Sequence, residues 1–330
     1  MADRDKDLTQ DVGLSENYVR RRTQGGHRFC HYLDTRFQIS LAQLAISGIL
    51  LGYCLRGYGQ HLYHEGYPLY FFQDSILFVQ HSYLHWKSHL GPAWQLLTRW
   101  QQEEPGGSRI VMPPSVLKAM VSVALLWNWP KFAAALLLGF SMMLHPAEFL
   151  TAVRKYLLLP SDILMDVLDC YLYIREPKTR RYARRQHGKC SDTTITLFLQ
   201  WLYRSARMDE PLYPLSSSAF RTRWNCVLDF LGIPRSLGVT PGILRGSGAT
   251  FFNYLTEDIN RIAWRGRWRK TSTLEFYLQE VAAQTMLNEL PSASRARVKR
   301  FSDCCYDLLV LMIKSGVEYE DFDWSRVSNS

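Results

Sequence analysis

A stretch rich in proline, glycine and charged residues, QQEEPGGSRIVMPPS at positions 101–115, separates two long apolar patterns in this sequence. Proline and glycine interrupt helices and strands, so a stretch of this composition is typical of a linker. The chain has 330 residues, the length of about two domains. We therefore predict two domains, joined by a linker at residues 105–113.

The segment before the linker is predicted to form a small helical domain over residues 35–104. Apolar residues recur there at intervals of three to four, beginning at Leu41, and Pro92 stands where a further helix would begin. Residues 1–34 are polar, and they carry the basic run Arg20, Arg21 and Arg22. We expect this part to be an arm with little order of its own.

Three histidines, His81, His85 and His89, recur every four residues, which would place them on one face of a helix. A metal site needs further ligands, and no carboxylate stands at a matching spacing. We expect a stripe that faces solvent or DNA, and no metal.

The segment after the linker, residues 114–290, has a mainly helical pattern with one candidate β-hairpin. Residues 168–176 alternate and are rich in β-formers, and the very basic PKTRRYARRQHGK follows as the turn and second strand. A tail over residues 291–330 contains an apolar helix. The predicted fold class is therefore mainly α with a small β-sheet.

Charge and apolar content limit the partners of this chain. The formal net charge of +9 favours a polyanion, namely DNA, RNA or an anionic membrane surface. The longest apolar stretch, residues 119–144, is interrupted by Asn128, Pro130 and Lys131, which suits two buried helices better than a membrane span. Seven cysteines without zinc-site spacing indicate reduced thiols in an intracellular protein.

Residues 239–281 combine the side chains needed for phosphodiester chemistry. Arg245 stands at the start of a helical pattern, a cluster of cations and tryptophans follows at residues 264–270, and Tyr277 lies in an apolar stretch that we expect to open another helix. A guanidinium, an indole donor and a phenol are the groups needed to attack a phosphodiester with a tyrosine oxygen. This stretch resembles the carboxy-terminal half of the catalytic domain of tyrosine recombinases, the phage integrase family.

The resemblance covers roughly residues 35–285. It implies an amino-terminal core-binding (SAM-like) domain and a mixed α/β catalytic domain, which clamp DNA from two sides. It also implies that Tyr277 is the nucleophile and forms a 3′-phosphotyrosyl intermediate without ATP or any other cofactor. Trp268, nine residues before Tyr277, matches the His or Trp of the family, and Arg245 matches the arginine of its His-x-x-Arg box. Lys178 lies in the strand–turn–strand where the family keeps the lysine that protonates the leaving 5′ oxygen.

Two positions depart from the family pattern. Gly242 stands where the box histidine is expected, and His145, in MLHPAEFL, stands where the family has an arginine in a setting like Leu-Arg-x-x-Glu-Leu. A glycine side chain can do no acid–base work, and a histidine cannot make the two-pronged contact of a guanidinium.

These departures leave three functions open. The first is an active recombinase in which His145 is a weak substitute for the arginine. The second is a catalytically dead DNA-binding remnant, as in a degenerate mobile element. The third is an unrelated helical interaction protein whose basic patches are solvated faces.

Double-stranded DNA is the expected partner, with a nuclear location if the cell is eukaryotic. Phosphate contacts by lysine and arginine supply most of the affinity for DNA. The cations expected to make them are Arg180, Arg181, Arg184, Arg185, Arg265, Arg267, Arg269 and Lys270. By resemblance, the tail helix at residues 306–313 packs against a neighbouring protomer in a homo-tetramer on DNA; the alternative is that it caps its own domain.

Overall fold

The computed structural model describes residues 16–104, 110–163, 168–175, 186–275 and 277–315. These residues are mainly helical and contain one small antiparallel sheet, as predicted. The chain divides into two compact units, residues 1–107 and 108–330, and the division falls inside the predicted linker. No helix among the described residues has the length and the apolar character needed to cross a membrane.

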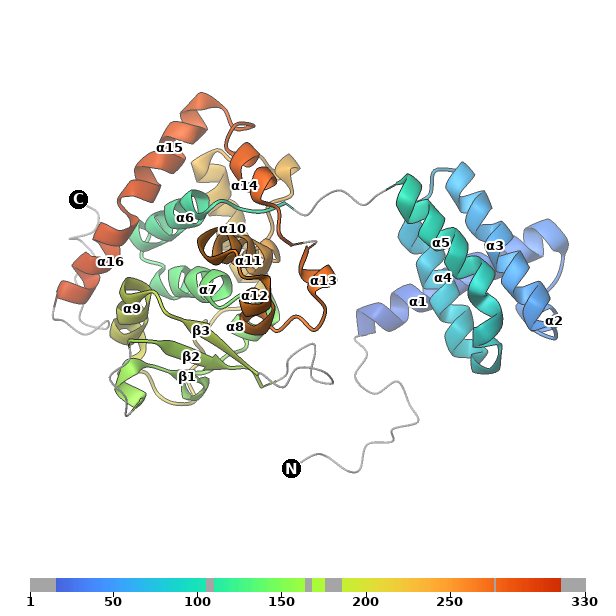
Figure 1. The fold of residues 1–330 in the computed structure, drawn as a ribbon, viewed down its shortest axis with the longest axis horizontal. Helices are drawn as coiled ribbons and strands as arrows, with labels where there is room; N and C mark the ends of the chain where they lie inside the picture. Colours follow the sequence, from blue (N-terminus) through green and yellow to red (C-terminus); the bar gives the residue numbers. More distant parts are fainter. Residues whose placement is uncertain (1–15, 105–109, 164–167, 176–185, 276, 316–330) are drawn as a thin grey trace. The chain divides into compact units, whose positions relative to one another are not determined.

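The first unit is a small helical bundle with its own apolar core (Figure 1). Its elements are α1 (Glu16–Phe37), α2 (Leu41–Leu44), α3 (Gly48–His64), α4 (Leu69–Ser82), the 3-10 helix η1 (Leu84–Leu90) and α5 (Gly91–Glu103). Ser40 caps α2, since its side chain accepts the Gln43 N–H. The glutamine side chain bonds back to the Ser40 N–H, which completes a capping box and fixes where the helix begins.

Helix α1 corrects the prediction of a poorly ordered arm over residues 1–34. From Glu16 onward this segment is helical, and Phe29 and Leu33 on one face of α1 are fully buried. A Cβ on Gly25 would lie 2.7 Å from the backbone of Asp74, so α1 and α4 approach each other closely. Arg21 of the basic run forms an ion pair with Asp74 at 3.0 Å. The polar composition reflects the exposed side of a packed helix.

The histidine stripe also differs from the prediction. Helix α4 ends at Ser82, so His81 lies in α4 while His85 and His89 lie in the 3-10 helix η1. The indole N–H of Trp86 donates to the Ala45 carbonyl at 2.8 Å and anchors this tighter turn. A 3-10 helix has three residues per turn, so a spacing of four no longer places side chains on one face.

The second unit combines helices with a three-stranded sheet. Its elements are α6 (Pro114–Leu126), α7 (Pro130–Ser141), α8 (Pro146–Leu150), η2 (Arg154–Tyr156), β1 (Leu157–Leu158), η3 (Pro160–Asp162), β2 (Cys170–Tyr173), β3 (His187–Cys190), α9 (Thr193–Tyr203), α10 (Ser217–Leu231), η4 (Arg235–Leu237), α11 (Ile243–Thr256), α12 (Ile259–Gly266), α13 (Thr271–Glu275), α14 (Glu280–Met286), α15 (Ser292–Asp303) and α16 (Cys305–Lys314). The strand order is β1-β2-β3, and both pairings are antiparallel. Strands β2 and β3 fall within the predicted hairpin, with Cys170 opposite Cys190.

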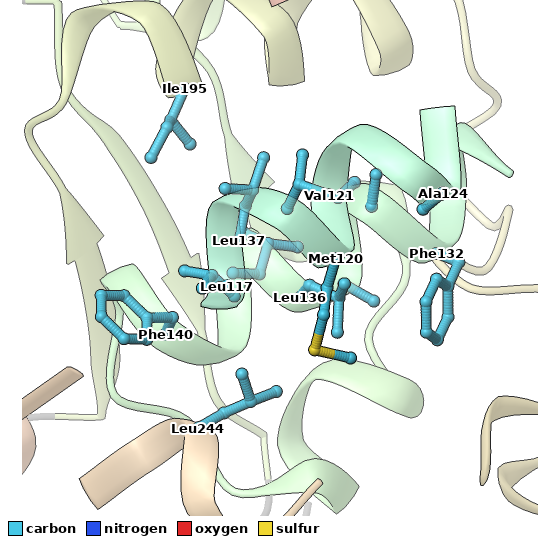
Figure 2. Close-up of a cluster of buried hydrophobic side chains, with 14 of the residues drawn as sticks. Leu117, Met120, Val121, Ala124, Phe132, Leu136, Leu137, Phe140, Ile195 and Leu244 are labelled. Carbon is cyan, nitrogen blue, oxygen red and sulfur yellow. The ribbon is translucent and has the colours of Figure 1, made fainter. Parts of the chain in front are cut away.

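Helices α6 and α7 form the centre of this unit (Figure 1). Most of their residues are buried, and both helices are apolar on several faces, with no single apolar stripe. Leu117 and Met120 of α6 pack near Leu136 of α7, and Ile195 of α9 and Leu244 of α11 belong to the same cluster (Figure 2). The long apolar stretch at residues 119–144 thus forms two buried helices, as predicted.

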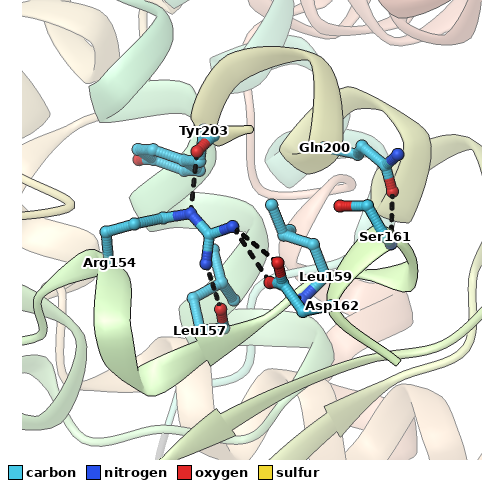
Figure 3. Close-up of polar contacts among 7 residues, drawn as sticks. All are labelled: Arg154, Leu157, Leu159, Ser161, Asp162, Gln200 and Tyr203. Carbon is cyan, nitrogen blue, oxygen red and sulfur yellow. Dashed lines mark hydrogen bonds and ion pairs between the residues drawn. The ribbon is translucent and has the colours of Figure 1, made fainter. Parts of the chain in front are cut away.

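A buried arginine joins the sheet to α9. Arg154 is 3% exposed and uses all three of its nitrogens (Figure 3). Its Nε donates to the Tyr203 carbonyl at 2.8 Å, one terminal nitrogen donates to the Leu157 carbonyl, and the other forms an ion pair with Asp162 at 2.9 Å. We interpret a buried guanidinium that has its own carboxylate and a partner for each of its three nitrogens as structural.

The tail helices pack against their own unit. Helix α15 lies along α6, and α16 lies against α9 and α6. Leu308, Leu309 and Met312 of α16 are buried in the main core. The sequence leaves two roles open for the tail helix, and in the structure the helix caps its own domain.

Candidate active site

Arg245 lies in the first turn of α11 and is 4% exposed. Its two terminal nitrogens donate to the Met143 carbonyl at 2.6 Å and to the Gly266 carbonyl at 2.5 Å. These carbonyls belong to the turn after α7 and to the end of α12, so one guanidinium joins segments that are far apart in sequence. The predicted position of Arg245 at the start of a helix is confirmed.

Trp268 and Tyr277 cover this guanidinium. The Arg245 guanidinium carbon lies 4.1 Å from the centre of a Trp268 ring, a cation–π contact. The ring centres of Trp268 and Tyr277 are 5.4 Å apart. A Cβ on Gly246 would lie 2.9 Å from the Tyr277 ring, so glycine at 246 gives the tyrosine its place against α11. The structure therefore brings three of the predicted site residues together.

Tyr277 lies in a turn, which corrects the prediction that its stretch opens a helix. Helix α13 ends at Glu275, and α14 begins at Glu280. The Thr250 hydroxyl donates to the Tyr277 carbonyl at 2.6 Å and accepts the Gln279 N–H at 3.4 Å. These bonds satisfy backbone groups that a continuous helix would use internally, and they hold the tyrosine backbone on α11.

His145 is the N-cap of α8, and Glu148, three residues later, connects it to the site. The backbone N–H of His145 donates to a carboxylate oxygen of Glu148 at 2.9 Å. The same oxygen forms an ion pair with Arg267 at 2.7 Å. Both side chains of this pair are almost fully buried, at 6% and 1% exposure. His145 is thus joined, through Glu148, to the group that contains Arg245.

The site carries an excess of positive charge. Burial, and to a lesser extent the neighbouring Arg267, lower the pKa of Arg245 to about 10, although Glu148 and Tyr277 act in the opposite direction. Arg245 is therefore still a cation at neutral pH. Two guanidinium groups share one carboxylate here, an arrangement that suits an anionic ligand such as a phosphate.

The predicted DNA-binding cations fall into three groups. Arg269 and Lys270 are exposed. Arg265 is half-buried, and it donates to the Lys189 carbonyl at 3.1 Å, which ties α12 to β3. Arg267 is buried against Glu148 and lies at the centre of the site instead of on the surface, and its contact with DNA stays a prediction. The predicted residues that lie outside the described part of the chain are Lys178, Arg180, Arg181, Arg184 and Arg185.

Two departures from the family pattern remain visible in the structure. Gly242 precedes the first residue of α11, and a Cβ there would have only the Thr240 hydroxyl nearby, at 3.8 Å. The side chain expected at this position is missing, but there is room for one. The role of His145 as a weak substitute for an arginine stays a prediction.

Sequence reasoning missed Glu148. The signal was present, because Glu148 stands three residues after His145 and matches the glutamate of Leu-Arg-x-x-Glu-Leu. Its partner Arg267 lies 119 residues further along, inside a run of cations that is typical of an exposed surface.

No protein-family model matches this chain, and no curated protein matches it in sequence. The functional argument therefore rests on the geometry of the site.

Proposed function

We propose that this protein binds double-stranded DNA and cleaves and rejoins one strand through a 3′-phosphotyrosyl intermediate, as tyrosine recombinases do. The observation that carries the proposal is the meeting of Arg245, Trp268 and Tyr277 with the start of α8. These groups come from segments more than a hundred residues apart, yet they form one buried, positively charged group beside a phenol. Guanidinium groups bind the two non-bridging oxygens of a phosphodiester, and a phenol oxygen can attack its phosphorus.

In the proposed reaction the Tyr277 oxygen attacks the phosphorus. The P–O bond to tyrosine forms, the P–O5′ bond breaks, and the phenol proton passes to solvent or to a nearby base. The leaving 5′ oxygen takes a proton, which the resemblance assigns to Lys178. Rejoining is the reverse reaction with a 5′ hydroxyl, so the bond energy is kept and no nucleotide cofactor is needed.

The burial of the site adds a requirement. Because Arg245 and Arg267 are covered, a phosphate reaches them only when Trp268 and Tyr277 move away from α11. The contacts of this segment include the Thr250 hydrogen bonds and a small apolar cluster, which contains Leu274 and Ile262 and is separate from the main core. We expect binding of the phosphate, free or as part of DNA, to supply the energy for this movement.

A DNA-binding remnant without catalysis is the second candidate. The observation that favours it is that both terminal nitrogens of Arg245 already donate to backbone carbonyls, while Gly242 offers no side chain. The exposed cations Arg269 and Lys270 support DNA binding in either case.

In this proposal the helical first unit acts as the core-binding domain that clamps DNA. A homo-tetramer on DNA remains part of it, but α16 buries its apolar face within its own unit. The contacts between protomers would therefore have to use other surfaces or release α16.

The deciding experiment is a suicide-substrate assay. Purified protein is mixed with a pool of nicked duplex DNA of randomised sequence, and protein–DNA adducts that survive denaturant are isolated and sequenced. We expect an adduct with the full-length chain and none with Tyr277→Phe, which keeps the ring contacts with Trp268 and removes only the nucleophilic oxygen. If the protein binds the DNA and no adduct forms, even in the double variant His145→Arg/Gly242→His, the second candidate is correct and the protein binds DNA without cleaving it.

A further inference from the structure

Arg267 has a backbone conformation that side chains rarely adopt. It ends α12 with φ 63° and ψ 36°, the left-handed region in which helices usually place a glycine. Met143 is a second such residue, with φ 51°. The described part of the chain has five non-glycine residues with positive φ, and these two meet at the candidate site. Strained conformations of this kind persist where the surroundings impose them, and they concentrate at functional sites.

The two residues with positive φ, Met143 and Arg267, direct a backbone carbonyl and a guanidinium to the same place in the site. The Met143 carbonyl accepts from Arg245 at 2.6 Å and lies 3.5 Å from a terminal nitrogen of Arg267. The Arg267 side chain points inward and reaches Glu148, so the two guanidinium groups lie beside each other. Like charges repel, so a fold that needed only a helix end at position 267 would be served better by glycine.

Comparison with Arg154 separates a structural arginine from this pair. Arg154 is also buried, but its three nitrogens are all engaged and it has a carboxylate of its own. Arg245 forms no ion pair within the described residues, and its buried Nε has no hydrogen-bond partner there. Two guanidinium groups therefore face the one carboxylate of Glu148, whose ion pair is with Arg267, and one positive charge is in excess. A buried positive charge with an unused donor points to an anionic ligand.

We propose that Arg267 is the second phosphate-binding guanidinium of the site and replaces the arginine that the family pattern places at position 145. Arg245 and Arg267 then contact the two non-bridging oxygens of one phosphodiester, and Glu148 positions Arg267 as it positions the start of α8. The second cation thus comes from the end of α12 instead of the start of α8. The inference rests on the proposed function for its reaction, while the anion site itself can be tested without cleavage.

The first test measures anion binding alone. The thermal midpoint of the full-length chain is recorded with millimolar inorganic phosphate, against chloride at equal ionic strength. We expect phosphate to raise the midpoint of the wild-type protein and of Arg235→Gly, which removes an exposed, ion-paired arginine away from the site. The rise should vanish in the double variant Glu148→Gln/Arg267→Gly, which removes both members of the buried ion pair together, so that neither is left facing a lost partner. An equal rise in all three proteins, or no rise in the wild type, overturns the inference.

The second test measures adduct formation on the suicide substrate. Removing one preorganised donor to a developing oxyanion lowers a rate by about 10²- to 10³-fold, and we expect a loss of that size in Arg267→Gly. Adding His145→Arg to Arg267→Gly should recover at least about tenfold of the loss, because it returns a guanidinium from the start of α8.

The outcomes separate the two proposals. A phosphate-dependent midpoint that needs Arg267, without any adduct, retains the anion site and rejects the recombinase. An adduct that forms at the wild-type rate in folded Arg267→Gly retains the recombinase and rejects the role of Arg267. A loss that His145→Arg does not recover, in variants with matched thermal midpoints, shows that Arg267 acts only as the partner of Glu148 and also overturns the inference.

Discussion

At the scale of single residues, Gly242 lacks the side chain for proton transfer that the resemblance to tyrosine recombinases leads us to expect at this position. The backbone there is helical, with φ −63°, and the nearest atom to an added Cβ is 3.8 Å away. A positioned general acid or base contributes about 10²- to 10⁴-fold to a rate. We expect Gly242→His to raise the rate of adduct formation at least about tenfold.

The measurement is the initial rate of adduct formation on a substrate that the wild type cleaves. Gly242→Gln is the matched control, because it adds a side chain of similar size that takes no part in proton transfer near neutral pH. A histidine variant no faster than the glutamine variant would mean that proton transfer does not limit this reaction.

Gly266 and Gly242 differ in the space around them, so substituting each with alanine tests the packing around Trp268. A Cβ on Gly266 would overlap the Trp268 ring, whereas one on Gly242 would meet open space. Gly266→Ala should therefore cost roughly 1–3 kcal/mol through overpacking, although alanine favours helices. Gly242→Ala should change stability by about 0.5 kcal/mol or less. Urea unfolding of both variants checks this, and similar midpoints for the two would show that Trp268 has another place to pack.

The sequence allows some of these residues to be placed and hides others for a physical reason. Arg245, Trp268 and Tyr277 were predictable because their spacing along 33 residues matches one pattern. The Glu148–Arg267 pair was not, because it joins positions 119 residues apart and its arginine stands in a charged run. Only the tertiary fold decides which cation of such a run turns inward.

At the scale of elements, apolar periodicity predicted the helices with one buried face and underestimated those with a narrow one. Helices α6 and α7 show no single apolar stripe and are predictable instead from their apolar runs, which proline and asparagine separate. The sequence of α1 predicts an arm with little order, because only a narrow face with Phe29 and Leu33 is buried while the other faces are polar. Strand β1 has two residues and exists only through its pairing with β2, so no local signal marks it.

Helix α16 offers a test at this scale. Leu309 is buried in the main core, whereas Leu311 on the same helix is 39% exposed. Leu309→Ala should lower the free energy of unfolding by about 2–5 kcal/mol, and Leu311→Ala by about 0.5 kcal/mol or less. Denaturant unfolding and light scattering measure both effects. A Leu309→Ala cost that depends on protein concentration would show that α16 packs between protomers instead of within one.

At the scale of the whole molecule, binding to DNA should follow the exposed cations and not the buried site. Each phosphate that a lysine or arginine neutralises changes the slope of log K against log salt by about 0.9. Arg269 and Lys270 are exposed, so Arg269→Ala/Lys270→Ala should make the slope shallower by about 2. Tyr277→Phe should leave the slope unchanged, because the phenol is uncharged when DNA first binds.

The matched control is Arg207→Ala/Arg235→Ala, which removes two exposed arginines that are already paired with Asp209 and Asp229. Fluorescence anisotropy on a labelled duplex between about 50 and 200 mM salt, the range over which such contacts change affinity strongly, gives the slopes. A shallower slope in the site-proximal pair alone would place DNA over the end of α12, beside Trp268 and Tyr277. Equal slopes for both double variants would mean that DNA responds to net charge only, and a slope near zero in the wild type would favour the unrelated interaction protein over both DNA-binding functions.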